Sequence, residues 1–156
     1  MDAAPPSVAL ASLWRDRQFI AVLLAGPAFW GVLWLIEQPQ DYGEWPLPSP
    51  AGFLLLALVY PVLEELVFRG ALQGGLARLC LGRKTLVGIT LANLFTSLVF
   101  SGLHLLNHPG LWALFVLPPS LVFGYFRDKY QRLWPPIGLH VSYNAGYFSL
   151  LGLTTS

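Results

Sequence analysis

Five long apolar segments, each close to the length of a membrane-spanning helix, dominate the sequence. A helix that crosses the hydrocarbon core of a bilayer needs about 20 mostly apolar residues. The segments predict an all-α fold, a polytopic transmembrane bundle of about five spans that forms one integral membrane domain over residues 1–156. Pro118 and Pro119 lie within the fourth segment, which we therefore expect to be kinked or broken. The segments cover residues 19–36, 51–79, 86–106, 111–126 and 137–153.

The composition favours lipid rather than water around most of the surface. Hydrophobic residues make up 55% of the chain and charged residues only 11%, with a mean hydropathy of +0.59. A soluble domain carries about 25% charged residues, which keep its surface wetted. The net charge of +1 and the lack of a basic run give no reason to expect a nucleic-acid partner. The single cysteine, Cys80, excludes an intramolecular disulfide.

Predicted loops that contain basic residues alternate along the chain with loops that contain none. Lysine and arginine are missing between the first two segments and again between the third and fourth. Because positive residues stay on the cytoplasmic side, this pattern predicts a cytoplasmic N-terminus, in what we expect to be a bacterial inner membrane. The basic residues assigned to the inner side are Arg15, Arg17, Arg78, Arg83, Lys84, Arg127, Lys129 and Arg132.

Three charged residues, Glu64, Glu65 and Arg69, fall inside the second apolar segment. A charge at the middle of the membrane costs about 2.5–3.5 kcal/mol on insertion scales, so each must be paired, hydrated or functional. Glu65 and Arg69 are four residues apart and can form an ion pair along a helix. Glu64 is rotated from both by roughly 100° or more, which leaves it as the carboxylate available to act as a general base. The alternative is that all three charges only join helices.

Two histidines and an asparagine occupy the third and fifth segments. His140 and Asn144 are four residues apart, so their side chains share one helical face and could donate two hydrogen bonds to one point. An oxyanion hole requires such a pair of donors. Phe100 lies one turn before His104 and can pack against its ring. The alternative is that these side chains form hydrogen bonds between helices.

These residues form three motifs that, in their order, resemble those of the CPBP family, the CAAX proteases and bacteriocin-processing enzymes, also called the Abi family. The resemblance covers residues 51–153 and includes the segment Pro61-Val-Leu-Glu-Glu-Leu-Val-Phe-Arg-Gly70. Within the family, the short chain is similar to the small bacterial type associated with C-terminal sorting signals, the JDVT-CTERM system. The motifs are Glu64-Glu65-x-x-x-Arg69, Phe100-x-x-x-His104 and His140-x-x-x-Asn144.

The resemblance implies a glutamic-type intramembrane endopeptidase that acts on a membrane-associated protein or peptide. In that reading Glu64 and His104 activate a water molecule, and His140 and Asn144 hold the oxyanion. Glu65 and Arg69 would be structural or face the substrate. No cofactor is expected, and the apolar perimeter is compatible with a monomer or a homodimer.

Other functions remain open from the sequence. Glu64, His104 and His140 could instead bind zinc, although the chain has no H-E-x-x-H motif. The polar cluster could also bind a peptide without cleaving it, as a membrane chaperone or immunity protein would. A proton-coupled transporter is disfavoured because the chain has no internal repeat.

The predicted topology contains one conflict. It places His104 near the outer end of its span and His140 near the inner end of another, yet catalytic groups must lie within hydrogen-bond reach of one reacting site. Either the fourth segment is re-entrant at Pro118 and Pro119, or the third span is shifted so that His104 lies deeper in the membrane.

Overall fold

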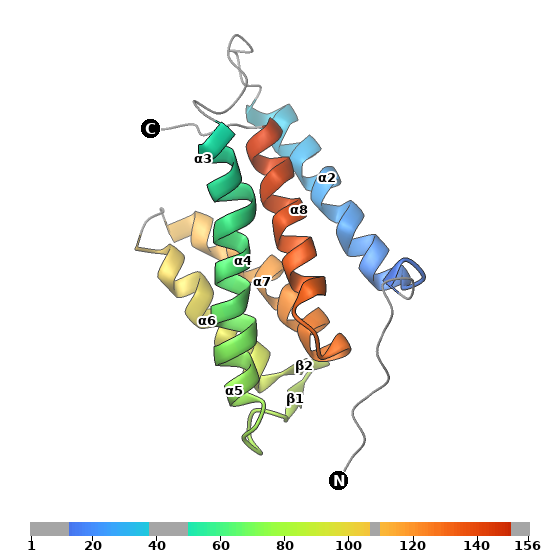
Figure 1. Cartoon of the computed structure of the whole chain (residues 1–156), viewed down its shortest axis with the longest axis vertical. Helices are drawn as coiled ribbons and strands as arrows, with labels where there is room; N and C mark the ends of the chain where they lie inside the picture. The colour runs from blue at the N-terminus through green and yellow to red at the C-terminus, as the bar shows by residue number, and fades with distance from the viewer. Residues whose placement is uncertain (1–12, 38–49, 107–109, 151–156) are drawn as a thin grey trace. The chain divides into compact units, whose positions relative to one another are not determined.

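The computed structural model describes residues 13–37, 50–106 and 110–150, which form helices and one short hairpin (Figure 1). Parts of three predicted regions, residues 38–49, 107–109 and 151–153, lie outside this description. Chain contacts divide the molecule into two compact units, a first unit of Met1–Ala57 with Ser142–Ser156 and a second unit of Leu58–Val141. The elements are α2 (Arg17–Glu37), α3 (Pro50–Leu54), η1 (Leu55–Val59), α4 (Tyr60–Glu65), η2 (Leu66–Gln73), α5 (Gly74–Leu76), β1 (Thr85–Leu86), β2 (Ile89–Thr90), α6 (Leu91–His104), α7 (Gly110–Tyr130) and α8 (Trp134–Leu150).

The elements from α3 to α5 form one continuous helix, Pro50–Leu76, drawn as the green column of Figure 1. Two of its stretches, η1 and η2, are π-helical, a wider turn than the α-helix expected from the sequence. Pro61 has no N–H to donate to the carbonyl four residues earlier, which weakens the α-helical ladder at η1. The neighbouring carbonyl of Leu56 accepts a 3.0 Å hydrogen bond from the Asn144 side chain.

This continuous helix is long and apolar enough to cross a membrane, and within the described ranges it alone meets both criteria. The helices of the other four segments lie close to the predicted ranges, as residues 17–37, 91–104, 110–130 and 134–150. The all-α prediction therefore holds apart from the hairpin. The count of five spans and the single membrane domain stay predictions.

In the first unit, α2 packs against the C-terminal part of α8 through aromatic side chains. The rings of Trp30 and Tyr143 meet edge to face with centroids 6.2 Å apart, and the Tyr143 hydroxyl donates a 2.6 Å hydrogen bond to the Val22 carbonyl. Gly26 and Gly146 leave the space that these rings fill, because a Cβ at either position would overlap a ring.

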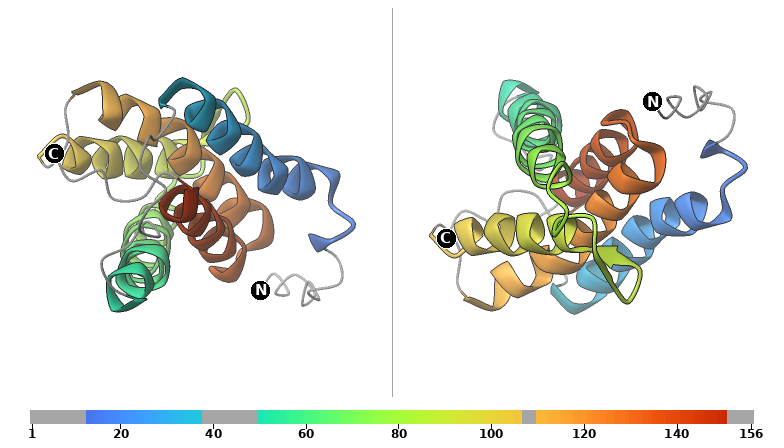
Figure 2. Two further views of the ribbon diagram at one scale, coloured as in Figure 1. Left: turned by 90° about the horizontal axis from the view of Figure 1, so that it is seen from above. Right: turned by 90° about the horizontal axis from the view of Figure 1, so that it is seen from below.

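In the second unit, α6 and α7 lie side by side, as both views in Figure 2 show. The approach is close at Gly124, where an added Cβ would overlap the Asn93 side chain. The Asn93 amide donates to the Leu121 carbonyl at 2.9 Å, so the contact that excludes a side chain on α7 also joins the two helices.

The predicted third span begins too early, because residues 85–90 form a hairpin rather than the start of a helix. Val87 and Gly88 have φ of 51° and 80°, the left-handed conformation that tight two-residue turns of antiparallel hairpins require. Thr90 then caps α6 by accepting a hydrogen bond from the backbone N–H of Asn93 at 3.0 Å.

The predicted fourth segment ends at residue 126, but α7 continues to Tyr130 and takes in part of the expected basic loop. Its last turns are anchored by Asp128, which accepts hydrogen bonds from Gln73 at 2.8 Å and Thr90 at 2.6 Å. At its middle, α7 continues through both prolines as a single helix rather than breaking there. A kink at these prolines stays a prediction.

Candidate active site

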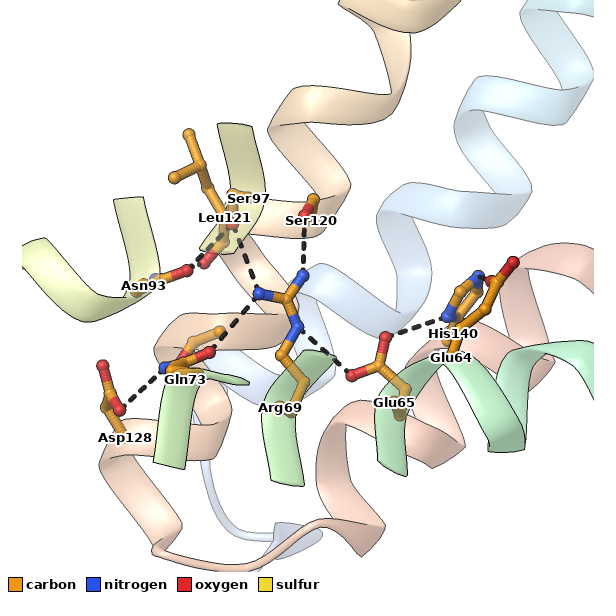
Figure 3. A network of polar contacts seen from close by, with 11 residues as sticks. Glu64, Glu65, Arg69, Gln73, Asn93, Ser97, Ser120, Leu121, Asp128 and His140 are labelled. Carbon is orange, nitrogen blue, oxygen red and sulfur yellow. Dashed lines mark hydrogen bonds and ion pairs between the residues drawn. The ribbon is translucent and has the colours of Figure 1, made fainter. Parts of the chain in front are cut away.

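Glu64 and Glu65 are the last two residues of α4, just before η2, and both approach the imidazole of His140 (Figure 3). The Glu64 Oε2 atom lies 3.6 Å from His140 Nε2, and its side chain is 34% exposed. Glu64 also interacts electrostatically with His104. The Glu64 carboxylate therefore lies beside the His140 imidazole, within electrostatic range of His104, and is still accessible.

Glu65 holds the other side of the same ring. Its Oε1 atom lies 2.9 Å from His140 Nδ1, and the Glu65 side chain is fully buried. An ionised carboxylate can only accept a hydrogen bond, so Nδ1–H of His140 donates to it and Nε2 is directed at Glu64. The Phe123 ring stacks on the imidazole with centroids 4.9 Å apart, which fixes the plane of the ring.

His104, the last residue of α6, is fixed by its own helix. Its Nδ1 lies 2.9 Å from the Phe100 carbonyl oxygen, which can only accept, so Nδ1 carries a proton. In the neutral ring Nε2 then carries the lone pair that can take a proton from water.

Phe100 connects the two histidines. Its buried ring lies 4.6 Å from the His104 ring and 6.1 Å from the His140 ring, measured between centroids. Phe68 from the glutamate-bearing helix meets the same ring edge to face at 4.9 Å. The expected packing of Phe100 on His104 is thus present, and the same ring also contacts His140.

A buried arginine completes the polar core of the site. Arg69 Nε lies 3.3 Å from Glu65 Oε2, the ion pair expected from their spacing, although its direction is not that of a hydrogen bond. Neither side chain is exposed. The guanidinium also donates to three neutral side chains, which are Ser120 at 2.6 Å, Ser97 at 3.3 Å and Gln73 at 3.3 Å. Removing a buried charge from water is costly, and these added hydrogen bonds offset that cost.

The hydrogen-bond network continues beyond Arg69 to the C-terminal part of α7. Gln73 accepts from Arg69 and donates through Nε2 to the Gly124 carbonyl at 3.0 Å and to Asp128. Sequence reasoning missed these partners. Gln73 could have been found, since it continues the four-residue spacing of Glu65 and Arg69, but Ser120 and Asp128 come from a distant helix and carry no local signal.

Asn144 belongs to the first unit, where its amide donates to the Leu56 carbonyl. The amide nitrogen carries a second hydrogen. The joint oxyanion role of His140 and Asn144 stays a prediction.

Across residues 13–37, 50–106 and 110–150, no group of three His, Cys, Asp or Glu side chains is placed to hold an ion.

The site combines a partly exposed carboxylate with an oriented imidazole beside it, which are the chemical groups that enzymes use to activate water. A model of the Rce1-like family, described as type II CAAX prenyl endopeptidase, matches residues 46–146, and the chain belongs to this family. The resemblance to CAAX proteases is thereby confirmed, and the protein is assigned to a family of membrane endopeptidases with membrane-associated protein substrates. Comparisons with curated proteins and with solved structures found no match.

Proposed function

We propose that this protein is a glutamic-type intramembrane endopeptidase that hydrolyses a peptide bond in a membrane-associated protein or peptide. The observation that carries the proposal is the 3.6 Å approach of Glu64 Oε2 to His140 Nε2. Both the C-terminal sorting signals of the JDVT-CTERM type and prenylated C-termini are candidate substrates. The site lies in a bacterial inner membrane, with the N-terminus in the cytoplasm.

In the proposed mechanism, Glu64 takes a proton from a water molecule that His104 helps to orient. The water oxygen attacks the scissile carbonyl carbon, and the electron pair of the C=O bond moves to oxygen. His140 and Asn144 donate hydrogen bonds to that oxyanion. The C–N bond then breaks, the electron pair returns to form the new carboxyl group, and Glu64 passes its proton to the leaving amine.

The role of His140 sets a condition on its protonation. With Nδ1–H donating to Glu65, only a doubly protonated ring can also donate from Nε2 to an oxyanion. Two carboxylates facing the ring compensate the positive charge of that form. Glu65 is therefore proposed as a positioning residue, held in place by Arg69.

The test begins with identification of the substrate. Membrane proteins from cells that contain wild-type protein, Glu64→Gln or no protein are compared by mass spectrometry for new termini. Loss of the general base should lower cleavage by about 10²–10⁴-fold, while Glu37→Gln, the matched change at the end of α2, should leave it unchanged. Near wild-type cleavage by Glu64→Gln would remove Glu64 as the base and favour a peptide-binding role.

A second measurement distinguishes this mechanism from one in which Glu64, His104 and His140 bind a catalytic zinc ion. Cleavage of the identified substrate is followed after incubation with a strong chelator, with metal content measured on the same sample. The proposed mechanism predicts unchanged cleavage. Loss with chelator and recovery with zinc would instead support metal-activated water.

A further inference from the structure

A polar cavity of about 480 Å³, lined by none of the residues of the glutamate–histidine site, lies between the end of α5, the following loop and the end of α7. Its volume falls within the range of roughly 300–1,000 Å³ that is typical of small-ligand sites. Three arginines line it, Arg78, Arg83 and Arg127, together with one acidic residue, Asp128. The charged lining is therefore net positive by two, from three cations and one anion.

The arginines of this cavity are not neutralised by the protein. Within the part of the chain that the structure describes, none of the three forms an ion pair with a carboxylate. Asp128 instead accepts hydrogen bonds from Gln73 and Thr90, one on each carboxylate oxygen. The Arg83 guanidinium donates to the Ala77 and Arg78 carbonyls, and the Arg127 guanidinium donates to the Gln131 side chain, all of which are neutral acceptors. An anion in the cavity would therefore supply the negative charge that these arginines lack.

An apolar groove of about 340 Å³ adjoins this cavity, and Gly82 lines both. Leucines of the loop after α5 form one wall, and the first two turns of α6, with Leu94, Phe95 and Leu98, form the other. The stretch from Leu91 to Leu98 along α6 is about 10 Å long, enough for the upper part of an acyl chain. Apolar side chains in the same region are strongly exposed, with Leu81 at 61% and Val87 at 95%.

We propose that the cavity and groove together bind one anionic phospholipid, with the phosphate of its headgroup among the three arginines and one acyl chain along α6. Charge complementarity selects the headgroup, because a zwitterionic lipid gains less from a site of net positive charge. The apolar groove selects a lipid over free phosphate. The site is separate from Glu64, His104 and His140, none of which lines either cavity.

The binding test uses full-length protein in a neutral detergent and native mass spectrometry with a matched lipid pair. Dioleoyl phosphatidylglycerol should bind at least about tenfold more tightly than dioleoyl phosphatidylcholine, because interfacial arginines contribute about 1 kcal/mol each. Added salt should weaken binding of phosphatidylglycerol and leave that of phosphatidylcholine unchanged. Equal binding of the two lipids, or binding insensitive to salt, would overturn the proposal.

Variants then locate the site. Arg78→Gln and Arg127→Gln should each weaken phosphatidylglycerol binding about fivefold and together about 25-fold, while the lysine variants keep most of it. Arg132→Gln, in the short linker after α7 and not among the residues that line the cavity, is the matched control and should have no effect. An equal loss in the control would place the lipid elsewhere.

Ligands with acyl chains of different length distinguish a phospholipid headgroup from a soluble phosphate. Dihexanoyl phosphatidylglycerol and glycerol phosphate carry the same anionic group with little or no chain, and both should bind more weakly than the dioleoyl lipid. Leu98→Gln should lower affinity only for the long-chain form. If glycerol phosphate binds as tightly as the lipid, the site recognises a soluble phosphate and the lipid assignment is wrong.

Discussion

Two neighbouring glutamates in this protein have different surroundings and, by our proposal, different roles. Glu64 is 34% exposed and reaches one nitrogen of His140, whereas Glu65 is fully buried between the other nitrogen and Arg69. A buried carboxylate with two charged or polar partners fixes geometry. A partly hydrated one can exchange protons with water. The division of roles therefore follows from burial and partners rather than from residue type.

The first prediction separates these roles by stability. Glu65→Gln leaves the Arg69 charge buried without its counter-ion and should lower the free energy of unfolding by about 3–5 kcal/mol. Glu64→Gln should change it by less than about 1 kcal/mol, because the site is part exposed. Denaturation in mixed micelles measures both. Equal destabilisation by the two variants would contradict the assigned difference.

A second prediction concerns the shortest hydrogen bond of Arg69. Ser120→Ala removes the 2.6 Å acceptor from the guanidinium and should cost about 1.5–3 kcal/mol of stability. Ser142→Ala in α8 serves as a comparison without a contact to Arg69 and should have a smaller effect. If both changes are tolerated equally, the hydrogen bond contributes little.

At the scale of elements, the length of α6 bears on the depth conflict between His104 and His140. Its 14 residues span about 21 Å, less than the roughly 30 Å of a hydrocarbon core. Under the proposed topology, in which Leu91 starts at the inner surface, such a helix would end inside the membrane, with His104 deeper than in the predicted span. Side chains on a helix also lean toward its N-terminus, which brings the His104 ring back over Phe100.

The third prediction tests the close contact of α6 with α7. Gly124→Ala places a methyl group against the Asn93 side chain and should destabilise the protein by about 1–3 kcal/mol. Gly102→Ala on α6 is the matched control, since nothing lies within 4 Å of an added Cβ there. Because alanine has a higher helix propensity than glycine, the Gly102→Ala variant should gain up to about 1 kcal/mol in free energy of unfolding. Thermal unfolding of both variants reveals whether their effects have opposite signs.

The fourth prediction concerns the hairpin before α6. Val87 is β-branched and has φ of 51°, a conformation that costs roughly 1–2 kcal/mol for such a residue. Val87→Asn should recover most of this cost, because asparagine tolerates the left-handed region. Because Val87 is 95% exposed, its replacement loses little packing. A decrease in unfolding temperature would argue against strain at this turn.

At the scale of the whole molecule, the sequence predicted the helices better than their details. Apolar length located all five helical regions, and the spacing of Glu65 and Arg69 predicted their ion pair. The contact of Glu65 with His140 could not be predicted, because it joins residues 75 positions apart. The π-helical stretch η1 was missed for a related reason, because the Asn144 side chain that donates a hydrogen bond to the Leu56 carbonyl comes from a helix distant in sequence.

The final prediction tests the proposed orientation in the membrane with a natural reporter. Cys80 is exposed, is the only cysteine in the sequence and lies in a basic loop assigned to the cytoplasm. A membrane-impermeant thiol reagent should therefore label it in inverted vesicles and not in intact spheroplasts. Detergent-permeabilised cells provide the positive control. Labelling from outside intact spheroplasts would reverse the topology.

The two π-helical stretches flank the turn that carries both glutamates, and each one adds backbone to a turn without lengthening the helix in proportion. Deleting a single residue from η1 would restore α-helical winding there and leave the residues on either side close to their present angular positions. A deletion from an α-helical part of the same helix would instead rotate the residues before it by roughly 100° relative to Glu64. The wide turns are therefore the places in this helix where a change of chain length can be absorbed without turning the carboxylate.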